Sequence, residues 1–315
     1  MPAPMTAQSI VSAKPRPSER GFSRVPMLTD HVEMTLTENG FNSDRLLLAP
    51  AFSPLRTIAS RLRQNGWPDL KMLNDIADAH CSHAVNANGE RIRFVAQSER
   101  SGRFEDGFEP RTFLRGEVMV RESNWHDLFN ALVWMTFPAT KAAINQRHYE
   151  SLKVQTGRQR SAVGDALTMF DEDGMVVLSD KPELLDLLRR FRWKQLFWGS
   201  REAVRARMRF VPIGHALYEK SLNPFIGMTA KSVLLHVPRG VLNLADRALN
   251  DAIDQRVAAY VRDTRNLVRG KSLAPLPVLG IPGWWPGNES ADFYDDTSYF
   301  RSGRSGGTSS ESSGL

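Results

Sequence analysis

The chain has 315 residues, of which 41% are apolar and 24% are charged, in the proportions of a globular protein with a buried core. Its single cysteine, Cys81, excludes an internal disulfide framework and a cysteine-rich zinc site. The net charge of +6 is small for this length, which argues against a dedicated nucleic-acid-binding protein. No apolar run approaches the roughly 20 residues of a transmembrane helix, and the N-terminus lacks the apolar core of a signal peptide. We therefore expect a soluble, cytoplasmic protein without membrane insertion.

Composition divides the chain into a central domain and two disordered ends. Residues 1–26 are rich in Pro, Ser, Ala and Arg without periodicity, and residues 302–315 are rich in Gly and Ser. Between them we expect one domain over residues 27–301. Helical patterns outnumber strand patterns there, and the two do not alternate regularly, which indicates the α+β class. The expected fold is mainly helical, with short strands, hairpins and an extended C-terminal arm rich in proline and aromatic residues.

The first half of this domain contains short helices, then strands, then two longer helices. Alternating apolar and polar residues predict a strand over 91–95 and one or two strands over 112–121. Residues 124–134 are apolar nearly all round a helix, which is typical of a buried helix. Pro138 ends that pattern and precedes a second helix over 139–149.

The second half begins with a turn signal. Asp173-Gly174 lies between two apolar runs, which predicts a tight hairpin. Short helices are expected from Pro182 and from Gly214, and an apolar strand over 232–237. The longest helix is predicted over 241–268.

The start of the buried helix over 124–134 carries polar residues. His126, Asp127 and Asn130 lie within an arc of roughly 100°. Polar groups at one end of a buried helix must be paired, bound to a ligand or exposed in a cleft. We interpret His126 as a general base or metal ligand that Asp127 orients. The alternative is a capping box, in which Asp127 pairs with Asn124 and favours the helix dipole.

His215 and Glu219 form a second candidate pair, four residues apart on a short helix. This spacing offers two ligands to a metal or lets a carboxylate orient a histidine, and the alternative is an ordinary surface pair. Two further polar groups are also candidate sites, although acids in a turn and residues on a Pro- and Gly-rich arm more often serve in turns and packing. These are Asp165 with Asp171 and Glu172, and Asn288 with Asp295 and Asp296.

No established catalytic signature occurs in the chain. It contains no His-Glu-x-x-His, P-loop or nucleophile-elbow sequence. The leading hypothesis is therefore an enzyme, with hydrolysis as the expected reaction, whose site combines histidines and acids for acid/base chemistry or for a divalent metal. The candidate catalytic residues are His126, Asp127, Asn130, His215 and Glu219, and all of these except Asn130 are candidate metal ligands.

Residues 189–209 support a different class of function. This stretch contains eight basic residues and one acidic residue, and aromatic residues lie between the basic ones. Single-stranded nucleic acids are bound by such surfaces through phosphate contacts and base stacking. In this alternative the binding residues are Arg189, Arg190, Arg192, Arg201 and Arg205. The pattern also fits aromatic residues that face the core and arginines that face water, and a non-catalytic interaction scaffold is the third hypothesis.

Several sequence blocks resemble one protein family. The first is Asn124-Trp-His-Asp-Leu-Phe-Asn-Ala-Leu-Val-Trp134, followed by Phe137-Pro138 and Lys141-Ala-Ala143. The others are Asp165-Ala-Leu-Thr-Met-Phe-Asp-Glu172, Gly214-His-Ala-Leu-Tyr-Glu219, and Gly280-Ile-Pro-Gly-Trp284 with Phe293-Tyr-Asp-Asp296. Together they resemble an uncharacterised proteobacterial family, the domain-of-unknown-function family 3025, over residues 45–301. The resemblance implies a bacterial protein and assigns neither an activity nor a catalytic residue.

Overall fold

Most of the described chain is helical. The computed structural model describes residue 41 and residues 45–62, 66–81, 84–98, 102–155 and 160–303. The α-helices are α1 (Arg45–Leu48), α2 (Arg56–Ala59), α3 (Leu70–His80), α4 (Phe108–Arg115), α5 (Trp125–Thr136), α6 (Pro138–Lys153), α7 (Ala162–Asp173), α8 (Pro182–Arg189), α9 (Arg201–Arg207), α10 (His215–Ser221), α11 (Arg239–Leu242) and α12 (Asp246–Arg262). None of these described helices combines the length and the apolar composition needed to cross a bilayer.

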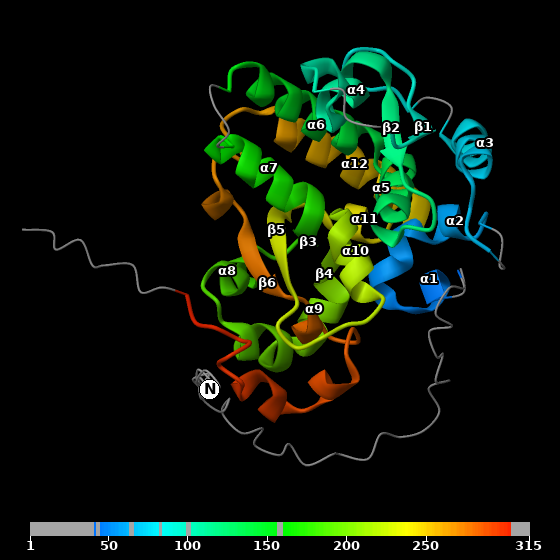
Figure 1. Cartoon of the computed structure of the whole chain (residues 1–315). Coiled ribbons are helices and arrows are strands. Elements are labelled where there is room, and N and C mark those ends of the chain that lie inside the picture. The colour runs from blue at the N-terminus through cyan, green and yellow to red at the C-terminus, as the bar shows by residue number, and fades with distance from the viewer. Residues whose placement is uncertain are drawn as a thin grey trace, which may run out of the picture. The chain divides into compact units, whose positions relative to one another are not determined.

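Two small sheets complete the α+β fold and confirm the predicted class (Figure 1). Strands β1 (Arg93–Ala96) and β2 (Glu117–Val120) form a parallel pair. The second sheet has the strand order β4-β3-β5-β6. Its strands are β3 (Gly174–Ser179), β4 (Met208–Pro212), β5 (Thr229–His236) and β6 (Ala274–Pro277). Strand β3 runs parallel to β5 and antiparallel to β4, and β6 runs antiparallel to β5.

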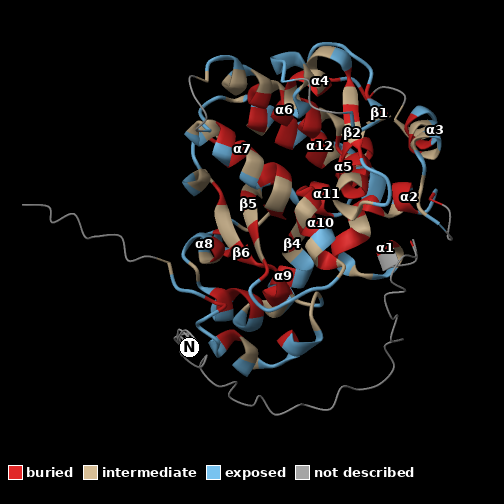
Figure 2. Ribbon diagram, in the orientation of Figure 1, coloured by how far each residue is buried: buried red, intermediate tan, exposed pale blue. Residues whose placement is uncertain are grey.

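The four-stranded sheet separates two hydrophobic cores. All six residues of β3 are buried, and successive side chains of a strand point to opposite faces. Val176 and Leu178 therefore belong to the core formed with α5, α6, α7 and α12, whereas Met175 and Val177 belong to the core formed with α8, α9 and the C-terminal segment. In Figure 2 the buried residues follow the sheet and the inner helices, and the exposed residues follow the outer loops.

Helix α5 matches the predicted buried helix closely. The side chain of Asn124 caps it by accepting a hydrogen bond of 3.0 Å from the backbone N–H of Asp127. Phe129 is fully buried and packs in one cluster with Phe52 and Tyr218, in which each ring contacts the other two. Pro138 occupies the first turn of α6, where its missing N–H has no cost.

Three sequence predictions are wrong in their local structure. Residues 112–115 end helix α4 instead of starting a strand, because Gly116 adopts φ +67° and terminates the helix in the left-handed region. Asp173-Gly174 is not a hairpin turn, since α7 continues to Asp173 and β3 starts directly at Gly174. The predicted longest helix is divided into α11 and α12, and Asp246 marks the new start with an acid in the first turn.

The two segments predicted to be disordered lie almost entirely outside the described residues. Residues 1–26, and 304–315 from the C-terminal segment, lie outside the described residues. The predicted boundaries of the domain therefore stay predictions. The C-terminal arm, however, belongs to the core formed with α8 and α9, which we call the second core, through buried Tyr294, Tyr299 and Phe300.

Candidate functional site

Three helices bring the two candidate histidines together. His126 lies in the first turn of α5, and His215 is the first residue of α10. Helix α10 packs against both α5 and α7, as Figure 1 shows. The Nε2 atoms of His126 and His215 are 3.0 Å apart, and the ring planes meet at 78°. Two histidines that are distant in the sequence therefore face one point.

Glu172, near the end of α7, is the third member of this group. Its Oε2 atom lies 3.6 Å from Nε2 of His215 and 3.8 Å from Nε2 of His126. One ligand atom from each of the three residues lies within 4.8 Å of the others. Among the described residues this is the group of three His, Cys, Asp or Glu side chains that is suitable for holding a metal ion.

A glycine allows α7 and α10 to meet. A Cβ atom on Gly214 would collide with the backbone of Glu172 and Gly174. The backbone N–H groups of Ile213 and Gly214 both donate to the carbonyl of Gly174 at 2.9 Å. Glycine is needed where two backbones approach so closely. This junction places Glu172 directly beside His215.

Each imidazole also has a carboxylate near its other nitrogen. Nδ1 of His126 lies 3.1 Å from Oε2 of Glu219, and Nδ1 of His215 lies 3.7 Å from Oδ2 of Asp171. Because a carboxylate oxygen only accepts, the Nδ1–H group of His126 donates a hydrogen bond to Glu219. In the tautomer with its only proton on Nδ1, Nε2 of His126 presents a lone pair to His215 and Glu172.

The tautomer of His215 follows from its surroundings. Its Nδ1 atom is buried without a hydrogen-bond partner, and the nearest charge is the carboxylate of Asp171. A bare lone pair on Nδ1 would face that negative charge in a low-dielectric interior, which is unfavourable. A proton on Nδ1 is therefore favoured, and Nε2 of His215 then also presents a lone pair. Two nitrogen lone pairs and a carboxylate oxygen converge on one point.

Burial controls the charge of His215. Its side chain is buried, and desolvation lowers its pKa to about 3, although Asp171 opposes the shift. His215 is therefore neutral at neutral pH, which is the form that binds metals. Burial also acts to raise the pKa of Asp171, but Lys141 and His215 outweigh it and lower the pKa overall. Lys141 is 3% exposed and donates to Asp171 at 2.5 Å.

The two other acids of the site differ in their environments. Burial raises the pKa of Glu172, although the electrostatic effect of the neighbouring His126 acts to lower it. For Asp127, burial acts in the same direction, but hydrogen bonds from Arg121 outweigh it, and its pKa is lowered. Asp127 accepts from the Arg121 guanidinium through both oxygens, at 2.8 and 2.9 Å. The carboxylate that contacts His126 is thus Glu219 and not Asp127, whose position agrees with the capping alternative.

A cavity of about 590 Å³ opens beside the histidine pair. It extends from α5, α7 and α10 to the start of α4. Among its lining residues are Arg103, Asp106, Glu109, Met119, Arg121 and Asn130. Asn130, a predicted site residue, is 5% exposed and its Oδ1 atom has no hydrogen-bond partner. His126, Asp127, Asn130 and His215 therefore share one cavity with Glu172.

Sequence reasoning missed Asp171, Glu172 and Lys141 as site residues. The hairpin predicted from Asp173-Gly174 places both acids in a turn. A helical reading of residues 162–173 would have put them at the end of a helix that leads into a buried strand. Lys141 lies on the polar side of α6 with Asn145 and His148, at positions i, i+4 and i+7.

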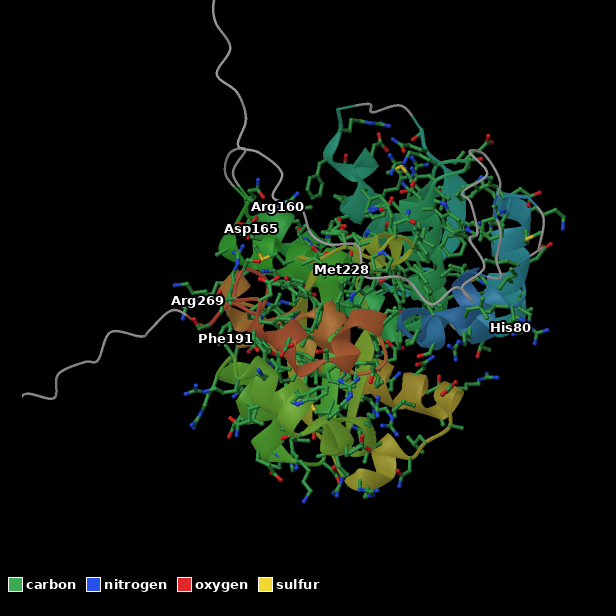
Figure 3. All side chains as sticks on the ribbon, turned by 90° about the horizontal axis from the view of Figure 1, so that it is seen from below. His80, Arg160, Asp165, Phe191, Met228 and Arg269 are labelled. Atoms are coloured by element: carbon green, nitrogen blue, oxygen red, sulfur yellow. The ribbon has the colours of Figure 1, made fainter. Side chains whose placement is uncertain are left out.

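The remaining predicted acidic groups lie elsewhere. Asp165 is exposed near the start of α7, at the far end from Glu172, and Figure 3 shows it near Arg160 at the edge of the molecule. On the C-terminal arm, Asn288 is fully buried and donates to the carbonyls of Leu279 and Ile281. Asp295 pairs with Lys194. These residues serve in packing and on the surface, as expected.

The basic stretch over 189–209 is largely engaged with the protein itself. Arg189, Arg201 and Arg205 form ion pairs with Asp186, Glu289 and Glu202. Arg190 and Arg192 are exposed. Of the interleaved aromatic residues, Trp193 and Phe197 are buried in the second core, whereas Trp198 is 38% exposed. Buried rings cannot stack on nucleic-acid bases, so this surface keeps basic groups, but two of its four aromatic residues are not available for stacking.

Comparison with known proteins gives a family. No curated protein and no solved structure matches the chain. The model of one family, described as "Protein of unknown function (DUF3025)", matches residues 92–304, a range that includes His126, Glu172, His215 and Glu219. This match confirms the family that the sequence motifs resemble, although it begins at residue 92 and does not extend over residues 45–91 as expected. The chain belongs to the DUF3025 family.

Proposed function

We propose that His126, His215 and Glu172 bind one divalent cation and that the protein is a metal-dependent hydrolase. The observation that carries this proposal is the convergence of two imidazole Nε2 atoms and one carboxylate oxygen. Both imidazoles have a carboxylate at Nδ1, from Glu219 and Asp171. Metal-binding histidines usually donate their second N–H to such a carboxylate, which fixes the ring and the tautomer.

The distances suit a small cation. The circle through three atoms separated by 3.0, 3.6 and 3.8 Å has a radius of about 2.0 Å, close to the bonds of about 2.0–2.2 Å that zinc makes to histidine and carboxylate ligands. A cation between the three groups would also offset the repulsion between two lone pairs and a carboxylate. The carboxylate of Asp171 lies beside Nδ1 of His215, and the ammonium group of Lys141 balances the charge of this carboxylate.

Three protein ligands leave a coordination position for water, as in catalytic zinc sites. A divalent cation lowers the pKa of a bound water towards neutrality and polarises a carbonyl or phosphoryl group, which is the chemistry of hydrolysis. The neighbouring cavity of about 590 Å³ is within the size range of small-molecule sites. Two histidines and one carboxylate also serve non-haem iron oxygenases, and the identity of the metal separates these two reaction classes.

Acid/base catalysis without a metal is the second candidate. The separation of 3.0 Å between the two Nε2 atoms also fits a proton shared by the histidines. Glu219 would then orient His126 as a general base. For either chemistry we propose a bacterial, cytoplasmic enzyme, because the motif blocks resemble a proteobacterial family and the single cysteine suits a reducing compartment.

Elemental analysis of the purified protein tests the metal. We expect about one divalent ion per chain in the wild type, since the three side chains define a single site. The variants His126→Ala, His215→Ala and Glu172→Gln should each lose it. The matched controls His236→Ala and Glu183→Gln change exposed residues of the same types and should retain it.

Addition of metal to chelator-treated protein gives the second readout. A ligand that binds only the folded state raises the melting temperature. Zinc, manganese or iron(II) should therefore raise the melting temperature of the wild type and of both controls but not of the three site variants. Absence of a bound ion together with absence of any thermal shift would overturn the metal proposal and favour the metal-free candidate.

A further inference from the structure

One carboxylate in the wall of the cavity lacks a cationic partner among the described residues. Glu109, in the first turn of α4, lines the cavity and forms no ion pair with a described Lys, Arg or His. The other lining carboxylates each face a basic group: Asp106 faces Arg103, Asp127 faces Arg121, Asp171 faces Lys141, and Glu172 faces the histidine pair. Glu109 is therefore the uncompensated negative charge of this wall.

A buried amide holds Glu109 in place. Nδ2 of Asn145, on α6, donates to Oε2 of Glu109 at 2.7 Å and to its backbone carbonyl at 3.0 Å. Because both partners only accept, the orientation of this amide is fixed. Its Oδ1 atom is buried without a donor. Asn145 thus positions Glu109, and its own Oδ1 atom is an acceptor that no described residue satisfies.

Asn130 provides an independent observation on the same cavity. Its side chain is 95% buried, it lines the cavity, and its Oδ1 atom has no partner. Buried polar atoms in native proteins are nearly always hydrogen-bonded to protein or to an ordered water, so an unpartnered amide in a cavity wall points to a ligand or a water. The wall thus offers the negative charge of Glu109, and Asn130 marks a position in it where a ligand or a water is expected.

We propose that this cavity binds a substrate carrying a positively charged nitrogen group, an ammonium or a guanidinium, with Glu109 as its counter-ion. Such groups carry several N–H donors and a positive charge, which can pair with the carboxylate of Glu109. The other end of the substrate reaches the proposed cation between His126, His215 and Glu172, so this part of the proposal rests on the proposed function. Recognition by Glu109 does not.

Hydroxamates are suitable probes because they bind metals without further reaction. Straight-chain ω-amino hydroxamates of increasing length are compared with alkyl hydroxamates in which a methyl group replaces the ammonium. We expect at least one amino compound to bind the metal-loaded wild type about tenfold more tightly than its alkyl counterpart, a difference of about 1.4 kcal/mol. Glu109→Gln should remove this preference and leave the affinity for the alkyl compound unchanged. Glu105→Gln, at an exposed position outside the cavity, should retain it.

A second measurement separates the two proposals. The melting temperature is recorded in low salt with hexylamine or with hexanol, neither of which requires the metal. Stabilisation by hexylamine alone, in the wild type but not in Glu109→Gln, supports the recognition site even if no hydroxamate binds and the metal proposal fails. Equal affinity for amino and alkyl hydroxamates at every length, with equal effects of hexylamine and hexanol, overturns the recognition site. The role of Glu109 would then be limited to its favourable interaction with the helix dipole at the N-terminus of α4.

Discussion

The Nε2 atoms of His126 and His215 lie 3.0 Å apart although 89 positions separate the two residues in the chain. A shared metal site requires such proximity, because histidine–metal bonds are about 2 Å long. The partners at the far side of each ring, Glu219 and Asp171, come from different helices. The site is therefore assembled by the packing of α5, α7 and α10.

The buried pair of Lys141 and Asp171 should be essential for stability. Lys141→Met leaves the Asp171 carboxylate buried without its cation, and loss of one member of a buried ion pair typically costs about 3–5 kcal/mol. The double variant Lys141→Met with Asp171→Leu should cost less than the sum of the single variants, since it leaves no uncompensated charge. Denaturant unfolding of the wild type, both single variants and the double variant measures this coupling.

The exposed pair of Lys71 and Asp75 gives a matched control for that cycle. Its side chains are 81% and 63% exposed, and its nitrogen–oxygen distance of 2.7 Å is similar. Lys71→Met should change the free energy of unfolding by about 0.5 kcal/mol or less, because water screens exposed pairs. If Lys141→Met costs no more than Lys71→Met, the buried pair does not hold the site.

Acid should destabilise the metal-free protein through His215. An unfolded histidine binds a proton near pH 6.5, whereas burial lowers the pKa of His215 to about 3 in the folded state. Between these values the unfolded chain binds more protons, so the free energy of unfolding falls as the pH falls. The contribution approaches about 1.4 kcal/mol per pH unit inside that window.

Denaturant unfolding in the presence of a chelator checks this acid dependence. Subtracting the curve of His215→Gln from that of the wild type should leave a slope between about pH 6 and pH 4. The lowered pKa of Asp171 acts in a different window, because its contribution is lost only as the pH falls below the ordinary aspartate range near pH 4. A flat difference curve above pH 4 would contradict the neutral, buried state of His215.

Replacement of His126 should separate function from packing. Its side chain is 31% exposed, so His126→Gln should keep the melting temperature within a few degrees of the wild type, roughly the effect of 1 kcal/mol in a chain of this length. Phe129, one turn further along α5, is fully buried, and Phe129→Ala should cost about 3–5 kcal/mol. Thermal unfolding of both variants provides the comparison. A fall of about ten degrees for His126→Gln would make His126 a structural residue.

The local chemistry of the sequence determined much of the secondary structure. An all-round apolar pattern, a capping asparagine and a following proline were enough to predict α5 and the start of α6. Gly214 marked the start of α10, where it precedes the first helical residue. These features were predictable because capping, proline geometry and helix periodicity act over a few residues.

The tertiary structure decided the composition of the site. Asp173-Gly174 has the sequence of a turn, yet Gly174 is required because a Cβ atom there would collide with the carbonyl of Phe170 where α7 meets β3. The close approach of Gly214 to the backbone of Glu172 and Gly174 places Glu172 beside His215, and this contact joins segments about 40 residues apart, so no local sequence pattern predicts it. The pairing of Glu219 with His126, and of Asp171 with Lys141, likewise joins different helices. Such contacts depend on how helices pack against one another, whereas sequence periodicity specifies only which face of each helix is buried.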